Sequence, residues 1–342
     1  MADARALIRD ALQACRVEPP RGFVWFGRRF RVAHDGSPDK EWARGTFLRA
    51  LTRHLYGHFY CRGGAVPLGR ASAISGVGEV RAFMTALSAA NRHRDRWDDG
   101  WTIVERKADQ CIVRKWDTDF TVTADGCRST GNEPLLAGSS VDVLVPSERW
   151  FEYPGYMLFH GRRIPEPRAG SAGLTRLYLN LDHDGACRMI DLCGTLDDLP
   201  LPYALKVAGR PEGLDRCDTV ILFIGREDYR RASEVLVETG RDLREMLRPG
   251  SPAFTRPIAR GVGVADDPGG GESFGESRCR LLAEGIVIAG ERGETGVEAR
   301  LRTIEDRFRQ AGTSLDRPHL NPGSTDYETG PWDRWPGREG RR

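Results

Sequence analysis

The hydrophobic pattern of the chain changes its period near Trp101, and this change most constrains the fold. Before it, helical spacing of apolar residues covers three segments, 3–15, 40–58 and 77–92. After it, short runs such as "WTIVERK", "CIVRKW", "FTVT" and "VDVLVP" alternate apolar with polar residues, which is typical of half-buried strands joined by turns. The sequence therefore predicts a mainly helical N-terminal region followed by an antiparallel β meander.

A second block begins after "RRIPEPRAGSAG", a segment rich in Arg, Pro and Gly. It contains the strand-like runs "LTRLYLNL", "LPYALKV" and "DTVILFI", with helices predicted near 185–197 and 227–247. A loop dense in Gly, Pro and Asp is expected at 248–275, and two helices follow it, the second clearly amphipathic. We expect an α+β fold in which a mixed sheet layer is covered by helices.

The same pattern predicts three units along the chain. The first is an N-terminal lobe of helices and meander at 1–165, and the second is a C-terminal α+β lobe at 166–327. Few aliphatic residues and many Gly and Pro residues follow, so 328–342 is expected to be a flexible tail.

Charge and cysteine usage exclude several classes of protein. Lys and Arg total 51 against 49 Asp and Glu, and a net charge of +2 favours neither nucleic acid nor an acidic membrane surface as partner. No apolar run approaches the roughly 20 residues that span a bilayer, and the first residues lack the apolar core of a signal peptide. The eight cysteines form no C-x-x-C pair, which predicts free thiols, no metal site and a cytoplasmic protein.

The run Gly271–Gly275 reads G-x-S-x-G, the pattern of a nucleophilic serine at a strand-to-helix elbow. Asp306 and His319 follow Ser273 in the chain order of a hydrolase triad. However, "ADDPGGG" precedes the serine where an apolar strand is required. A capping box, with Ser273 as N-cap and Glu276 three residues later, is the favoured interpretation.

Only four of the 51 basic residues are lysines, and two of them, Lys206 and Lys115, are candidates for a general base. The alternation in "LPYALKV" places Lys206 on the face opposite Tyr203, and Lys115 ends the run "CIVRK". A lysine can act as a base once desolvation lowers its pKa, whereas arginine stays charged. A solvated surface lysine is the alternative interpretation for each.

An ordered series of segments carries a resemblance to a known family. The segments are "HLYGHFYCRGG", "LSAANRHRDRWDDGW", "VRKW", "VPSERWFEYPGY", "LTRLYLNL", "LPYALKVAG", "DRCDTVILFI", "FTRPIARGVGVADDPGGGESFGESRCRLLAEGI" and "DRPHLNPGS". In this order they closely resemble the HopA-type effector family over roughly residues 40–327. That family includes secreted effectors of plant pathogens and lyase-like proteins of class V lanthipeptide and thioamitide pathways.

The resemblance implies a phosphoserine/phosphothreonine lyase that needs no cofactor. A kinase of the aminoglycoside-phosphotransferase type would phosphorylate Ser or Thr in a ribosomal precursor peptide. The lyase would then eliminate phosphate to leave dehydroalanine or dehydrobutyrine. The implied partners are the phosphorylated precursor peptide and that kinase, with a cyclase and a second copy of the chain as further candidates.

Roles follow from what β-elimination needs, which is a base for the α-proton and cations for the departing phosphate. Lys206 is the first candidate for the base and Lys115 the second, while His319 or Tyr203 would assist the leaving oxygen. The candidate phosphate ligands are Arg256, Arg278, Arg176, Arg216, Arg317 and the helix start at Ser273. The alternatives are a non-catalytic protein that binds the precursor or scaffolds the kinase through a strand edge, and a serine hydrolase built on Ser273.

Overall fold

The computed structural model describes residues 3–33, 39–69, 74–115, 118–131, 134–153, 155–163, 165, 173–199 and 201–335. The helices are α1 (Ala4–Ala14), α2 (Lys40–His58), α3 (Val77–Ala89), α4 (His183–Leu192), α5 (Gly194–Asp198), α6 (Tyr229–Thr239), α7 (Leu243–Met246), α8 (Phe274–Glu291), α9 (Val297–Gln310) and α10 (Gly330–Asp333), with 3-10 turns η1 (Tyr60–Arg62), η2 (Ala124–Gly126), η3 (Pro211–Asp215) and η4 (Arg226–Asp228). The strands are β1 (Cys15–Glu18), β2 (Gly22–Trp25), β3 (Arg28–Arg31), β4 (Arg96–Lys107), β5 (Gln110–Lys115), β6 (Thr118–Thr123), β7 (Cys127–Ser129), β8 (Ser140–Val145), β9 (Glu148–Tyr153), β10 (Tyr156–His160), β11 (Leu174–Leu179), β12 (Tyr203–Ala208), β13 (Val220–Gly225), β14 (Arg256–Ala259) and β15 (Val262–Asp266).

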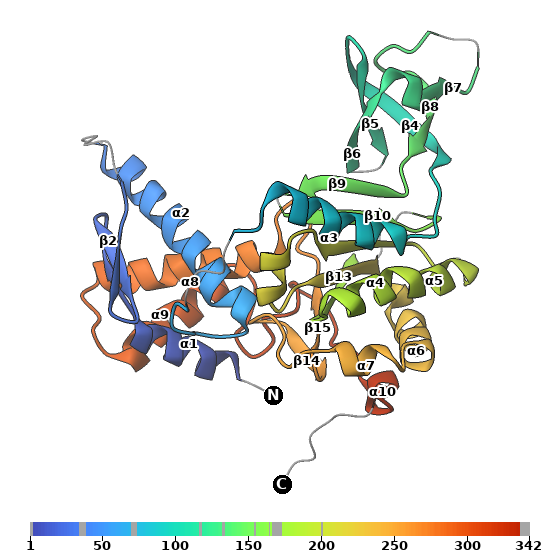
Figure 1. The fold of residues 1–342 in the computed structure, drawn as a ribbon. Helices are drawn as coiled ribbons and strands as arrows, with labels where there is room; N and C mark the ends of the chain where they lie inside the picture. Colours follow the sequence, from blue (N-terminus) through green and yellow to red (C-terminus); the bar gives the residue numbers. More distant parts are fainter. Residues whose placement is uncertain are drawn as a thin grey trace.

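A seven-stranded sheet forms the centre of the molecule, in the order β14-β15-β11-β13-β12-β10-β9 (Figure 1). The predicted α+β class is confirmed. The sheet was expected to be mixed, but its neighbouring strands pair antiparallel throughout. It also combines β9 and β10 with strands that follow residue 166, so the central sheet crosses the predicted boundary between the two lobes.

Each face of the central sheet is covered by its own set of helices. Leu177, Leu205 and Leu222 share a core with residues of α3 to α7 and α10. Tyr178 and Ile221, on the opposite face, share a second core with α1, α2, α8 and α9 and with strands β1 and β2. Alternation along β11, β12 and β13 decides which side chains enter which core. Figure 1 shows the two helical layers on either side of the sheet.

The predicted meander folds into a separate five-stranded sheet, in the order β6-β5-β4-β8-β7. Its inward residues, among them Trp101, Ile103, Val113 and Val143, form a third core made from this sheet alone. In Figure 1 the sheet projects away from the helical body. This small sheet therefore stabilises itself and does not extend the main core.

Several elements differ from the sequence prediction for local reasons. The predicted helix at 227–247 is interrupted at Gly240, where a Cβ would lie 2.5 Å from the Leu236 carbonyl oxygen. The predicted helix at 185–197 is similarly divided into α4 and α5. Residues 15–31 form the sheet β1-β2-β3 inside a region expected to be mainly helical.

Two further segments are more ordered than expected. Strand β15 lies inside the predicted loop at 248–275, and all five of its residues are buried although its flanks are rich in Gly and Pro. In the predicted flexible tail, α10 places Trp332 and Trp335 in the first core, at 0% and 3% exposure. Tail residues 336–342 lie outside the described part of the chain.

Candidate functional site

Lys206 lies on β12 and points to the α2/α8 side of the central sheet. It pairs in register with Ile221 of β13 and Leu158 of β10. Its Nζ lies 4.2 Å from the ring centroid of Tyr156, which stands on the neighbouring strand β10. We call Lys206, Tyr156, Arg176, Arg216 and Tyr56 the Lys206 cluster.

Arg216 is held in this cluster by two partners. Its Nε and Nη2 donate to the two carboxylate oxygens of Asp218 at 2.7 and 2.6 Å, and Nη2 also donates to the Tyr56 hydroxyl at 3.0 Å. Asp218 is buried at 1% exposure. Burial alone would lower the pKa of Arg216, but the Asp218 carboxylate raises it, so the guanidinium stays charged. Its Cζ lies 5.2 Å from the Tyr56 ring centroid and 5.4 Å from that of Tyr156.

Arg176 comes to the cluster from β11. Its Nε donates to Asp267 Oδ2 at 2.6 Å, and its Cζ lies 5.1 Å from the Phe223 ring centroid. Arg176 stands two residues before Tyr178, whose partner Ile221 is also the partner of Lys206. Arg176 and Lys206 therefore share one face of the sheet.

The surroundings of Lys206 lower the pKa of its amine to about 8. Burial is the main cause, and the positive charges of Arg176 and Arg216 add to it, whereas Asp218 and Glu276 act in the opposite direction. A substantial fraction of the amine is consequently uncharged at a pH near 8, as a general base requires.

Two tyrosines give the cluster hydroxyl groups. Tyr156 is buried, and its hydroxyl has no hydrogen-bond partner among the residues that the structure describes. Burial raises the pKa of Tyr156 well above its ordinary value, so the group remains a hydrogen-bond donor. The Tyr56 ring stacks on Tyr60, with centroids 5.3 Å apart.

The start of α8 packs directly on the rings of Tyr56 and Tyr60. A Cβ at Gly275 would lie 2.4 Å from the Tyr60 ring and 2.7 Å from the Tyr56 ring, so only glycine permits this approach. The first turn of α8 thereby brings Glu276 close enough to influence the Lys206 amine. The "SFGES" motif thus serves to seat α8 against the cluster.

Ser273 is the N-cap of α8, as the favoured interpretation predicted. Its Oγ accepts a hydrogen bond from the Glu276 backbone N–H at 3.2 Å and donates to the Glu276 carboxylate at 2.8 Å. The residues of a hydrolase triad do not meet. His319 hydrogen-bonds Asp326, whereas Asp306 pairs with Arg309 on α9.

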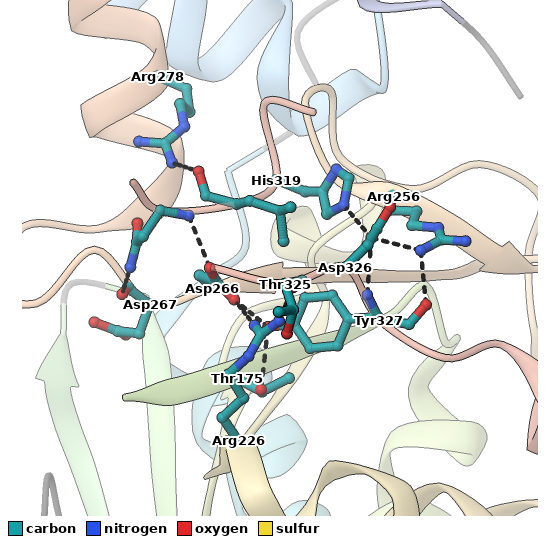
Figure 2. A network of polar contacts seen from close by, with 12 residues as sticks. Thr175, Arg226, Arg256, Asp266, Asp267, Arg278, His319, Thr325, Asp326 and Tyr327 are labelled. Carbon is teal, nitrogen blue, oxygen red and sulfur yellow. Dashed lines mark hydrogen bonds and ion pairs between the residues drawn. The ribbon is translucent and has the colours of Figure 1, made fainter. Parts of the chain in front are cut away.

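Arg256 and His319 belong to a second polar network at the β14 edge of the sheet (Figure 2). Arg256 Nη1 lies 2.5 Å from Asp326 Oδ1 and donates to the Tyr327 carbonyl at 2.7 Å, while His319 Nε2 lies 2.8 Å from the same Asp326 oxygen. Arg256 pairs with Val264, which belongs to the face opposite Lys206. The structure therefore does not bring Arg256 or His319 to Lys206.

Arg278 is a buried structural residue, contrary to its predicted contact with phosphate. At 4% exposure, its Nε donates to the Pro318 carbonyl at 2.7 Å and its Nη2 to the Leu320 carbonyl at 3.1 Å. It thus ties the segment around His319 to α8. Arg317 lies exposed on that segment, at a cavity that Arg256 and His319 also line.

Lys115 and Tyr203 lie apart from the Lys206 cluster. Lys115 ends β5 in the small sheet, where its Nζ lies 2.9 Å from Asp98 Oδ2. Tyr203 points to the first core, as the alternation predicted, and its hydroxyl lies 2.8 Å from His93 Nε2. Of the predicted site residues, Lys206, Arg176 and Arg216 come together, and the first turn of α8 joins them.

Sequence reasoning did not single out Tyr56, Tyr156 or Asp218. All three lie within segments that carry the family resemblance, "HLYGHFY", "FEYPGY" and "DRCDTV". Their residue types did not indicate a functional role, because a tyrosine or an aspartate in such a run is commonly structural. Only the pairing of β10 with β12 reveals that Tyr156 faces Lys206.

The described residues contain no group of three or more His, Cys, Asp or Glu side chains that could hold a metal ion. No described helix combines the length and apolar character needed to cross a membrane. All eight cysteines are free, as predicted.

The fold and the Lys206 cluster define an α+β protein with a half-buried lysine close to two arginines. Residues 152–320 match the HopA1 effector protein family, which confirms the HopA-type resemblance over this part of the chain. The chain is also similar to the solved effector protein from Pseudomonas syringae pv. tomato strain DC3000, at 13% identity and a TM-score of 0.45, over 79% of this chain and 90% of that one. The effector protein from Pseudomonas syringae pv. syringae strain 61 is 14% identical, with a TM-score of 0.40 over 79% of this chain and 88% of that one. No curated protein matches the chain.

Proposed function

We propose that this protein is a phosphoserine/phosphothreonine lyase, acting on a ribosomal precursor peptide that a kinase has phosphorylated. The observation that carries the proposal is the amine of Lys206, held beside Arg176 and Arg216 with its pKa lowered to about 8. Desolvation and the like charges of Arg176 and Arg216 both disfavour the protonated form of this half-buried lysine.

Lys206 is the base in this proposal. Its neutral amine removes the α-proton of the phosphorylated residue, and the C–H electron pair forms the Cα=Cβ double bond. The Cβ–O bond breaks, and phosphate leaves with the electron pair of that Cβ–O bond. The products are dehydroalanine or dehydrobutyrine, inorganic phosphate and the Lys206 ammonium, which returns its proton to water.

Arg176 and Arg216 hold the phosphate in this proposal. Guanidinium groups match a phosphoryl group in shape and charge, and neither arginine loses its proton near neutral pH. Ion pairs of Arg176 with Asp267 and of Arg216 with Asp218 fix the orientation of both guanidinium groups. The pair thus binds the substrate and neutralises the negative charge that grows on the departing oxygen.

The departing oxygen needs a proton or strong hydrogen-bond donors, because a dianionic phosphate ester would otherwise leave as a trianion. The Tyr156 hydroxyl has no hydrogen-bond partner among the described residues and can donate to that oxygen, while Arg176 and Arg216 neutralise its charge. This arrangement replaces the assistance that His319 and Tyr203 were predicted to give, because both lie away from Lys206.

The test uses a phosphothreonine peptide, incubated with the protein and followed by mass spectrometry. The wild-type chain should yield a species one water lighter than the unphosphorylated peptide. Lys206→Met should abolish the product, and Lys115→Met serves as the matched control because its amine lies in the small sheet. Return of the peptide to its unmodified mass would mean a phosphatase and would overturn the proposal.

A further inference from the structure

An open cavity of about 530 Å³ lies at the β14 edge of the central sheet, and no member of the Lys206 cluster lines it. The start of α1, η1, strand β14 and the segments 250–261 and 315–319 form its walls. Its volume falls within the range of about 300–1,000 Å³ that is usual for ligand sites. The proposed lyase chemistry assigns this cavity no role.

Unpaired positive charge remains at the rim of the cavity. Asp326 is already bound by Arg256 and His319, and Asp316 lies 2.5 Å from Arg5. Arg260 and Arg317 are exposed and make no side-chain hydrogen bond or ion pair with any residue that the structure describes. Two guanidinium groups are therefore open to an anionic partner.

The backbone that lines the cavity is constrained at two residues, Phe254 and Gly63. Phe254 has a φ of 69°, which is unusual for a residue other than glycine, and its ring is buried against Phe59 and Phe308 at centroid distances of 5.5 and 5.8 Å. At Gly63 a Cβ would lie 2.7 Å from the Ser251 carbonyl oxygen. Strained conformations of this kind concentrate at functional sites.

Apolar and charged groups both line the cavity. Leu7, Pro252 and Leu315 line it together with Arg62, Arg260 and Arg317. A small inorganic anion would use only the arginines. A peptide with both carboxylate and apolar side chains would use both kinds of group, since apolar contact adds affinity when water is excluded.

We propose that this cavity is a docking site for an acidic peptide segment. Carboxylates of the segment pair with Arg260 and Arg317, and its apolar side chains lie against Leu7 and Leu315. The size of the cavity suits a few residues of extended chain and excludes a folded domain. This inference concerns binding alone and does not depend on the lyase reaction at Lys206.

The test measures fluorescence anisotropy of a fluorescein-labelled peptide of alternating Glu and Leu. The double variant Arg260→Glu/Arg317→Glu should raise Kd at least tenfold. The control Arg81→Glu/Arg241→Glu makes the same change in net charge at exposed arginines outside the cavity, and its Kd should match that of the wild type. Circular dichroism establishes that both variants are folded.

Two results would overturn the inference. Equal loss of binding in both double variants would mean that net charge alone attracts the peptide. Displacement of the peptide by inorganic phosphate at concentrations similar to those of the unlabelled peptide would mean a simple anion site. Displacement by the unlabelled Glu–Leu peptide, with no effect of equimolar free glutamate, is the expected result.

Discussion

The Nζ atom of Lys206 lies 4.2 Å from the ring centroid of Tyr156, across the antiparallel pair β12 and β10. The ring face favours the protonated amine, whereas burial and the two arginines disfavour it. Burial prevails, and the balance leaves the pKa at about 8. A lysine on an exposed strand would stay almost fully protonated at that pH.

The pH dependence of kcat/KM should report this amine. Because the neutral form is the base, log(kcat/KM) should rise with a slope of one below pH 8 and level off above it. The phosphate is already a dianion in this range, since its second pKa is about 6. Initial rates between pH 6.5 and 9.5 measure the profile, and a flat profile across pH 8 would exclude Lys206 as the base.

Lys206→Met should make the protein more stable at pH 7. The folded state holds the pKa of Lys206 near 8, below the ordinary value of 10.5. The penalty for the half-buried ammonium is therefore complete below pH 8 and disappears between pH 8 and 10.5. We expect a gain of about 1–3 kcal/mol in the free energy of unfolding at pH 7, which shrinks at pH 10. Urea unfolding at both values measures it, and a wild type more stable at pH 7 would contradict the burial argument.

Arg278→Met should destabilise the fold. The change leaves the buried carbonyls of Pro318 and Leu320 without their donors, at a cost of about 2–4 kcal/mol. Arg280→Met on the same helix removes a partly exposed pair with Glu272 and should cost less than about 1 kcal/mol. Chemical denaturation compares the two. Unchanged stability of Arg278→Met, together with lost phosphopeptide binding, would instead restore its predicted contact with phosphate.

Ser273→Ala should affect stability and leave catalysis intact. Loss of the N-cap hydrogen bond to the Glu276 N–H should cost about 1 kcal/mol in thermal or chemical unfolding. Elimination of phosphate should continue at a rate close to that of the wild type. Labelling of the wild-type protein, but not of this variant, by a serine-directed acylating reagent would revive the hydrolase interpretation.

Periodicity predicted the elements whose patterns are long and regular. Helices α2 and α9 and the run containing Lys206 follow directly from the spacing of their apolar residues. Periodicity did not predict β15, because this buried strand is short and its flanks are rich in Gly and Pro. It did not predict the burial of Trp332 either, because an isolated aromatic residue shows no periodic pattern.

The site was predictable only in part. Lys206 stood out because lysine is rare in this chain, and Arg176 joins it because both residues alternate onto one sheet face. Arg256 was predicted to bind phosphate but lies on the face of the sheet opposite Lys206. Its face depends on how β14 pairs with β15 and β15 with β11, and the sequence does not show this pairing. The partnership of Arg216 with Asp218 and Tyr56 likewise depends on where α2 ends over the sheet.

The most direct measurement of the central claim is mass spectrometry of a phosphothreonine peptide treated with the wild type, Lys206→Met or Lys115→Met, with a thiol added to trap alkenes. We expect the wild type and Lys115→Met to give a thiol adduct of the dehydrated peptide. Lys206→Met should still bind the phosphopeptide but form at least about 100-fold less product. An adduct formed equally by all three proteins, or by none, would contradict the proposed lyase mechanism.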